Sequence, residues 1–230
     1  MWNRQELKAR GKDAFKRNYW PCVGVAFILG ILTASSGSSA RGGSDSGESF
    51  KELFTNASDA MGISVGALIG LILGIIGVGL VIGLVLTWFV KNPFVVGCKS
   101  FFLKNSWENA TFGCVMDGFR GNYGRVVVTM LFKDLLVFAG TLLLVIPGII
   151  LTYSFRMVPY ILAENPDIEA TEALRLSRDM MQGNKWNAFV LDLSFLGWFI
   201  LTAFTCGILG IFYVNPYYYA TDAELYQAIR

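Results

Sequence analysis

The feature that most constrains this chain is a short motif that recurs three times where an amphipathic stretch meets an apolar run. Its three copies are Arg17-Asn18-Tyr19-Trp20, Gly121-Asn122-Tyr123-Gly124 and Gly183-Asn184-Lys185-Trp186. The apolar stretches that follow come back out through a proline, at Asn92-Pro93-Phe94, Val158-Pro159-Tyr160 and Asn215-Pro216-Tyr217. Because proline interrupts a helix and self-similarity along a chain reflects a repeated structural unit, this pattern predicts three copies of one helical hairpin.

Composition places these hairpins in a membrane. Of the 230 residues 54% are apolar and 16% are charged, and the mean hydropathy is positive, which is unusual for a soluble domain. Each span needs about 20 apolar residues. We therefore expect an all-α polytopic membrane protein with about six transmembrane helices, arranged as three hairpins, and amphipathic helices on the cytoplasmic face. It would form a single integral membrane domain over residues 1–230, with repeat-like units at 1–105, 106–165 and 166–230.

The first apolar run, Trp20 to Thr33, has a basic start and a short apolar core, as a secretory signal peptide also has. The motif before it recurs before two later hairpins, and a cleaved leader has no reason to share an internal repeat. We therefore interpret this run as the first transmembrane helix. The Ser- and Gly-rich segment 35–61 that follows is predicted to be a solvated extracytoplasmic loop.

The run from Ile63 to Val90 contains 28 residues without a charge and is the strongest predicted span. Glycines recur in it at four-residue spacing, a pattern that lets helix backbones approach closely in a membrane. We predict helix packing through these glycines, and a glycine-lined pore is the alternative. The residues are Gly66, Gly70, Gly74, Gly79 and Gly83.

Lysine and arginine set the expected orientation. They concentrate in residues 1–18, 91–125 and 156–185, which lie on one side of a six-helix arrangement. The positive-inside rule then places both termini in the cytoplasm. The loop 35–61 and the turns at Ile146-Pro147-Gly148 and Thr205-Cys206-Gly207 would lie outside.

The hinge motif itself combines two kinds of residue. We interpret Asn18, Asn122 and Asn184 as helix caps, and Trp20 and Trp186 as anchors at the membrane interface. Amphipathic helices are expected before the first hinge and, from Asn165-Pro166, before the third.

Several classes of function find no support in the sequence. The chain has no histidine, its four cysteines are scattered without a Cys-x-x-Cys pair, and its net charge is only +2. Histidine-based catalysis, zinc sites and redox dithiols are therefore disfavoured, as is nucleic-acid binding. We expect no cofactor, no metal and no catalytic residue.

The ionisable residues within the apolar runs are the candidate functional side chains, because charges in a span are costly to expose to lipid. They are Lys133, Asp134 and Asp192, together with Arg156 at the end of an apolar run. One hypothesis makes Asp134 and Asp192 a paired carboxylate site for protons or a cation. The other has Asp134 neutralised by Lys133 or another cation, and Asp192 close enough to the interface to reach water.

Several motifs resemble a known family, the bacterial integral membrane proteins with domain of unknown function 975. These motifs are Ile146-Pro147-Gly148-Ile149-Ile150, Tyr160 to Pro166, Glu172-Ala173 through Ser177, and Met180 to Trp186. Asn18-Tyr19-Trp20 and Asn215-Pro216-Tyr217 are similar as well, whereas Gly124 departs from the tryptophan of the other two hinges. The resemblance implies a multi-spanning membrane protein without an established activity.

We therefore expect an integral membrane protein that is not an enzyme and that acts through membrane lipids, a membrane-protein partner or a second copy of itself. The alternative is a small transporter or channel that uses Asp134 and Asp192.

Overall fold

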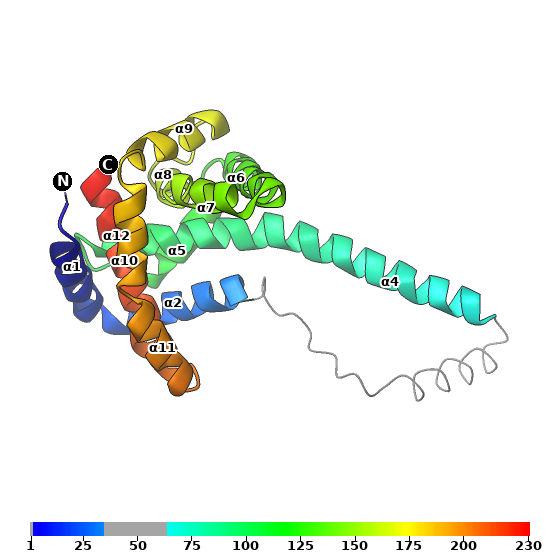
Figure 1. The fold of residues 1–230 in the computed structure, drawn as a ribbon, viewed down its shortest axis with the longest axis horizontal. Helices are drawn as coiled ribbons and strands as arrows, with labels where there is room; N and C mark the ends of the chain where they lie inside the picture. The colour runs from blue at the N-terminus through cyan, green and yellow to red at the C-terminus, as the bar shows by residue number, and fades with distance from the viewer. Residues whose placement is uncertain (1, 35–63) are drawn as a thin grey trace. The chain divides into compact units, whose positions relative to one another are not determined.

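The computed structural model describes residues 2–34 and 64–230, and every regular element in these two ranges is a helix (Figure 1). The all-α prediction is confirmed for them. The predicted extracytoplasmic loop 35–61 lies outside the described residues.

The described residues divide into two units. One contains α4 (Val65–Leu86), and the other contains residues up to 34 together with 88–230. The described residues of the first unit are little more than α4. A Cβ built at Gly66, Gly70 or Gly74 would meet no atom within 4 Å. The packing role of the glycines and the single domain over 1–230 both stay predictions.

The repeat seen in the sequence corresponds to helix boundaries. A helix begins directly after each hinge asparagine: α2 (Tyr19–Ala34), α6 (Tyr123–Leu143) and α10 (Lys185–Leu193). A second set of helices has a proline in the first turn, where its missing N–H is not needed: α5 (Asn92–Asn105), α8 (Val158–Glu164) and α12 (Asn215–Ile229). The hinges therefore coincide with helix starts, and each of the three prolines lies in the first turn of a helix, whereas the arrangement as three hairpins is not confirmed.

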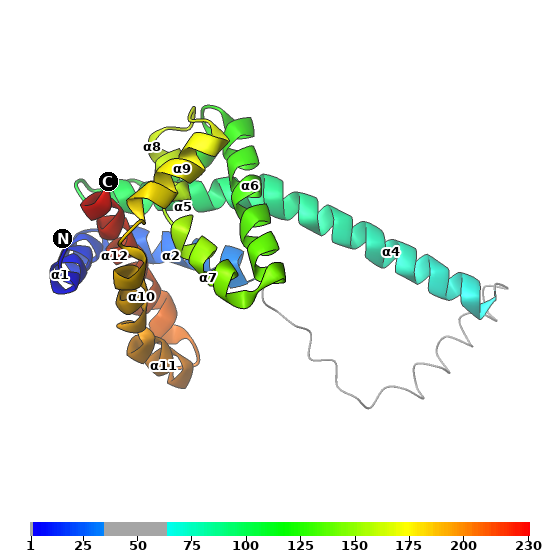
Figure 2. The same ribbon diagram turned by 45° about the horizontal axis from the view of Figure 1, so that its top comes forward.

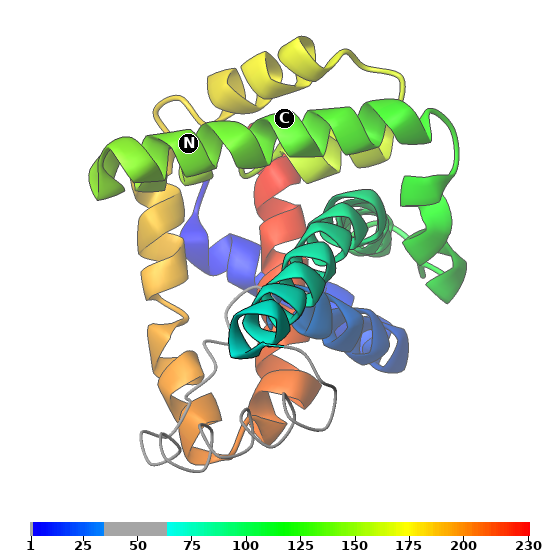
Figure 3. The same ribbon diagram turned by 90° about the vertical axis from the view of Figure 1, so that its right-hand side faces the viewer.

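The remaining helices complete two hairpins and two amphipathic segments. The helix α7 (Val145–Ser154) lies beside α6 in a hairpin whose tip is at Leu144 (Figure 2). From α10 the chain continues through α11 (Leu196–Phe204), turns at Cys206 and Gly207, which both have positive φ, and returns towards α12 (Figure 3). The amphipathic helices are α1 (Arg4–Arg17) and α9 (Ala170–Met180). Short 3₁₀ and π-helical segments lie at Phe112–Phe119, Thr87–Lys91 and Gly210–Val214.

The three proline-led helices form the centre of the larger unit. The helix α5 packs against both α8 and α12, and the buried ring of Tyr160 in α8 stacks on Tyr226 in α12 with centroids 5.2 Å apart. The amphipathic helix α1 lies along α12. There Gly11 allows the close approach, because a Cβ at this position would lie 2.8 Å from the backbone nitrogen of Thr221.

Among the described residues, four helical segments are long and apolar enough to cross a membrane. They are Gly66–Asn105, Tyr123–Leu143, Val145–Glu164 and Lys185–Phe204. The apolar stretch Tyr19–Thr33 is shorter, and α12 carries Asp222 and Glu224. The prediction of six spans in three hairpins is therefore not confirmed.

We predict that Gly97→Ala destabilises the protein, because a Cβ on α5 at this position would collide with the backbone carbonyl of Val115. Overpacking of this kind costs about 1–3 kcal/mol. Gly197→Ala in α11 is the matched control, since its Cβ would meet nothing within 4 Å and alanine favours a helix by about 1 kcal/mol. Thermal unfolding in detergent should show a lower Tm for Gly97→Ala only. An equal Tm for both variants would contradict the close approach of α5 to residues 112–119.

Candidate functional site

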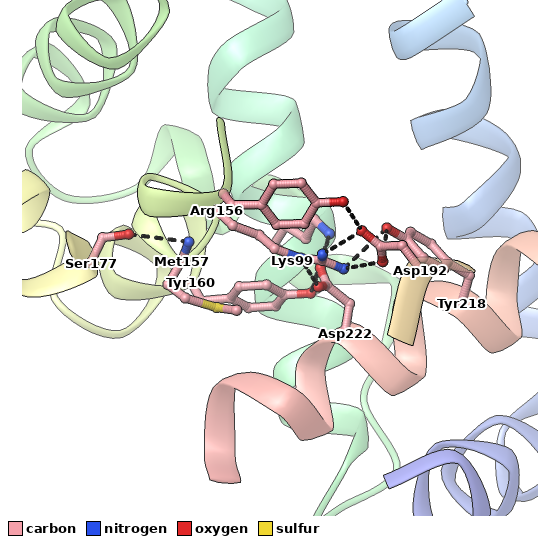
Figure 4. A network of polar contacts seen from close by, with 9 residues as sticks. Lys99, Arg156, Met157, Tyr160, Ser177, Asp192, Tyr218 and Asp222 are labelled. Carbon is pink, nitrogen blue, oxygen red and sulfur yellow. Dashed lines mark hydrogen bonds and ion pairs between the residues drawn. The ribbon is translucent and has the colours of Figure 1, made fainter. Parts of the chain in front are cut away.

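Polar side chains from five helices and one turn meet inside the larger unit. We call this set the arginine network. Its members are Lys99 of α5, Tyr153 of α7, Arg156 of the α7–α8 turn, Tyr160 of α8, Asp192 of α10, and Tyr218 and Asp222 of α12. Figure 4 shows the contacts among Lys99, Arg156, Tyr160, Asp192, Tyr218 and Asp222.

Arg156 lies at the centre of the network. Its Nη1 and Nη2 donate to the two carboxylate oxygens of Asp192 at 2.7 and 2.9 Å, a bidentate pair. Its Nε donates to Asp222 Oδ1 at 2.8 Å, and Nη2 also donates to the Tyr218 hydroxyl at 3.1 Å. The planar guanidinium suits such a bridge, because its donors are fixed in a fork that matches carboxylate geometry.

The turn that carries Arg156 is itself held in place. The hydroxyl of Ser177 in α9 accepts a hydrogen bond from the backbone N–H of Met157 at 3.2 Å and donates to the carbonyl of Ser154 at 2.9 Å. Ser177 is fully buried. The amphipathic helix α9 therefore holds the backbone on both sides of Phe155 and Arg156, and so it fixes the position of the guanidinium.

Asp222 is the most deeply buried charge of the network, with 4% of its side chain exposed. Its Oδ2 accepts from Lys99 Nζ at 2.7 Å and from the Tyr160 hydroxyl at 2.8 Å. The Lys99 ammonium also lies 4.9 Å from the ring centroids of Tyr160 and Tyr219, within cation–π range. Burial alone would raise the pKa of Asp222, but Arg156 and Lys99 outweigh it and hold this pKa well below its usual range.

Asp192 completes the network. Besides the two bonds from Arg156, it accepts from the hydroxyls of Tyr153 at 2.9 Å and Tyr218 at 3.1 Å. The network thus contains two cations and two carboxylates, and each of the four carboxylate oxygens accepts at least one hydrogen bond. Such a set is neutral as a whole and offers little free acceptor capacity for an additional ion.

The other predicted carboxylate has different partners. Asp134 in α6 pairs with Lys133 at 3.1 Å and accepts from the amide of Asn92 in α5 at 3.2 Å. No contact joins Asp134 to Asp192 in the part of the chain that the structure describes. The two aspartates therefore belong to separate ion pairs, as the second hypothesis expected for Asp134.

Two of the three hinge asparagines do not act as the predicted helix caps. Asn122 and Asn184 precede α6 and α10, yet neither side chain caps the helix that follows. Asn18 instead donates to Asn105 Oδ1 and to the carbonyl of Ala110, both at 2.8 Å, and Asn122 donates to Asp167 Oδ1 at 2.6 Å. Asn184 donates to the carbonyl of Met180 and accepts from the Trp2 indole. The capping interpretation was wrong for α6 and α10, because these amides tie the helix starts to other segments.

The aromatic hinge residues Trp20 and Trp186 lie on the surface of the unit, where both are largely exposed. Their role as interface anchors stays a prediction.

Five members of the arginine network were not among the candidates predicted from the sequence: Lys99, Tyr153, Tyr160, Tyr218 and Asp222. A signal for two of them was present: Lys99 and Asp222 each follow the proline of their helix, Pro93 and Pro216, by six residues. Equivalent positions of two repeat units thus carry opposite charges that pair with each other. Tyr160 had no comparable signal, since a tyrosine in an apolar run is ordinarily a core residue.

We predict that Asp222→Asn is far more destabilising than Asp134→Asn. Removing the Asp222 charge leaves Arg156 and Lys99 buried without full compensation, which costs about 3–5 kcal/mol. Asp134 is 40% exposed and forms an ion pair with Lys133 alone among the described residues, so its loss should cost less than that of Asp222. Thermal unfolding of both variants in the same detergent measures the difference. Equal losses would contradict the central position of Asp222.

The pH dependence of the stability difference between wild type and Asp222→Asn follows from the lowered pKa of the Asp222 carboxyl. The folded-state pKa of Asp222 lies below its ordinary value of 3.8, so the stability contributed by its carboxylate is present above that value and is lost as the pH falls through the folded pKa. We expect the Tm difference between wild type and Asp222→Asn to stay constant from about pH 8 to 5 and to narrow only below about pH 4. A difference that narrows already between pH 7 and 5 would contradict this assignment.

No metal-binding group of three or more His, Cys, Asp or Glu side chains occurs in residues 2–34 or 64–230.

Neither a curated protein nor a solved structure matches the chain. A family model does match residues 63–230, which include the motifs at 146–186 and 215–217. The chain therefore belongs to this family, whose description is Protein of unknown function (DUF975).

Proposed function

We propose that the chain is a multi-pass protein of the bacterial cytoplasmic membrane, with both termini in the cytoplasm, that acts through contacts with lipids or membrane proteins and catalyses no reaction. The observation that carries this proposal is the arginine network. Its charges lie within or beside apolar helices and balance one another, as expected of a structural element rather than a catalytic or transporting one.

The surfaces of the hairpin helices support a role in contact with lipid or a partner. Large apolar side chains are exposed along α6 and α11, among them Phe138, Leu142 and Phe204. Such contiguous apolar surface is stable in lipid or against another protein, and is costly in water. A membrane-protein partner or a second copy of the chain would cover the same surface.

The alternative of a transporter or channel that uses Asp134 and Asp192 is not favoured. It needs both carboxylates at one aqueous site, and each is engaged by its own cation.

We predict that proteoliposomes containing the chain conduct protons and sodium no faster than protein-free vesicles. Flux is measured with a pH-sensitive dye and with radioactive sodium, and Asp134→Asn serves as the matched variant because it leaves the arginine network intact. The proposal would be contradicted if vesicles containing the chain conducted either ion faster than empty vesicles and Asp134→Asn abolished this flux.

Purification of the full chain in mild detergent, with identification of co-purifying lipids and proteins, tests the positive half of the proposal. We expect at least one lipid class or membrane protein to be retained in a fixed ratio to the chain. A chain that retains neither would contradict it.

A further inference from the structure

A cleft of about 240 Å³ lies between α7 and α10. We call it the tryptophan cleft. Each helix contributes three of its six lining residues: Ile149, Ile150 and Tyr153 of α7, and Lys185, Trp186 and Phe189 of α10. Both helices lie in segments that are apolar enough to span a membrane, so the proposed function places the cleft beside lipid.

One wall of the cleft is held in place by the arginine network. The Tyr153 hydroxyl donates to Asp192 at 2.9 Å, and Asp192 is itself held by Arg156. The ring of Phe189 packs against the rings of Tyr153 and Trp186, with centroids 6.2 and 5.4 Å away. A ligand therefore meets aromatic walls that are already ordered, which lowers the entropic cost of binding.

The walls and the volume of the cleft favour a slender apolar group. The lining is apolar almost throughout, and Ile149 and Trp186 are 51% and 71% exposed. A helix with its side chains is about 10–12 Å across, so a single turn of it exceeds the volume of the cleft. A single acyl chain is thin enough to enter.

The charge at the cleft is positive. The helix α7 carries no lysine, arginine, aspartate or glutamate, and α10 carries only Lys185 and Asp192. Asp192 is paired with Arg156, whereas the Lys185 side chain has no ion-pair or hydrogen-bond partner within residues 2–34 and 64–230. The cleft therefore presents one uncompensated positive charge, which is costly beside lipid.

The start of α10 adds to this positive character. Its N-cap residue, Asn184, does not cap the helix with its side chain, because the amide is engaged by Trp2 and by the carbonyl of Met180. The first N–H groups of α10 thus lack a side-chain cap and lie at the positive end of the helix dipole. The indole N–H of Trp186 has no acceptor in the described part of the chain, so it is a further donor beside Lys185.

Two charged side chains of α1 approach another face of α10, and both are cations. Lys8 donates to the hydroxyl of Ser194 at 3.1 Å, and Arg4 lines a second cavity together with Asn187 and Val190. None of the described carboxylates lines either cavity. The surroundings of the cleft therefore favour an anion.

We propose that the tryptophan cleft binds an anionic membrane phospholipid, with one acyl chain between α7 and α10 and with Lys185 and Trp186 as donors to the phosphate. A phospholipid with one net negative charge matches the single uncompensated charge of Lys185, and charge-assisted hydrogen bonds to phosphate oxygens are strong. A fatty acid fits less well, because apolar surroundings raise the pKa of its carboxyl group and favour the neutral form. This inference rests on the proposed function and names the lipid class for its contacts.

The test is a titration of the full-length chain in detergent micelles, followed by native mass spectrometry. The probes are phosphatidylglycerol, phosphatidylcholine with the same acyl chains, and the free fatty acid of the same length. We expect the wild-type chain to bind phosphatidylglycerol at least tenfold more tightly than either of the others, because the choline ammonium cancels the phosphate charge. Equal binding of phosphatidylglycerol and phosphatidylcholine, or tighter binding of the fatty acid, would overturn the inference.

Variants of the cation test the phosphate contact. Lys185→Gln should weaken phosphatidylglycerol binding about tenfold through the loss of a charge-assisted hydrogen bond, and Lys185→Arg should retain it. Lys12→Gln, which removes the same charge from an exposed position of α1, is the matched control and should have no effect. An equal loss in Lys185→Gln and Lys12→Gln would indicate attraction by net charge alone and would overturn the site.

Variants of the wall test the acyl-chain contact. Ile149→Trp should fill the cleft and weaken phosphatidylglycerol binding about tenfold. Ile146→Trp makes the same change on the same helix at a position that is 71% exposed and outside the lining, so it should have no effect. If Ile149→Trp instead releases a co-purifying membrane protein and leaves phosphatidylglycerol binding unchanged, a protein side chain occupies the cleft and the inference is wrong.

Failure of this inference and failure of the proposed function are distinguishable. Phosphatidylglycerol binding that is unchanged in both Lys185→Gln and Ile149→Trp would overturn the cleft as a lipid site and leave the proposed function intact. Ion flux in proteoliposomes would overturn the proposed function irrespective of Lys185.

Discussion

The bridge that Arg156 makes between Asp192 and Asp222 is the interaction on which the rest of the larger unit depends. It joins the α7–α8 turn to α10 and α12, and Lys99 extends it to α5. Apolar side chains of equal volume would give similar or greater stability, but they would not fix which helices meet, since a buried charge tolerates only an arrangement that pairs it. We therefore interpret the network as the element that specifies the arrangement of the proline-led helices.

The repeat supplies the geometry for this bridge. The prolines of α5 and α12 place Lys99 and Asp222 at equivalent positions, six residues further on, and the two side chains meet at 2.7 Å. In the middle unit the charge comes from Arg156, which lies just before the proline of α8. Three proline-containing segments thus contribute charges to a single ion-pair cluster, and each segment contributes a different residue.

Much of the local structure could be predicted from the sequence, because it depends on local chemistry. Proline fixes a helix start, and an apolar run without charges predicts an apolar helix, so the boundaries after Asn18, Asn122 and Asn184 were predictable. The partners of those asparagines were not, since an amide before a helix can cap it or bind a distant segment with equal ease. Likewise, Arg156 and Asp192 were recognised as costly charges, but pairing across 36 residues depends on tertiary packing that no local pattern encodes. The count of six spans is not confirmed, because the apolar stretch Tyr19–Thr33 is shorter than the four long apolar segments among the described residues and α12 carries the buried acids Asp222 and Glu224.

Arg156 belongs both to the neutral network and to the lining of a cavity between α6 and α7. Four of its N–H groups are committed to the network, so the guanidinium cannot move towards a ligand without loosening the bonds to Asp192 and Asp222. Because four hydrogen bonds hold the guanidinium, its position and the arrangement of α10 and α12 around the α7–α8 turn are fixed together.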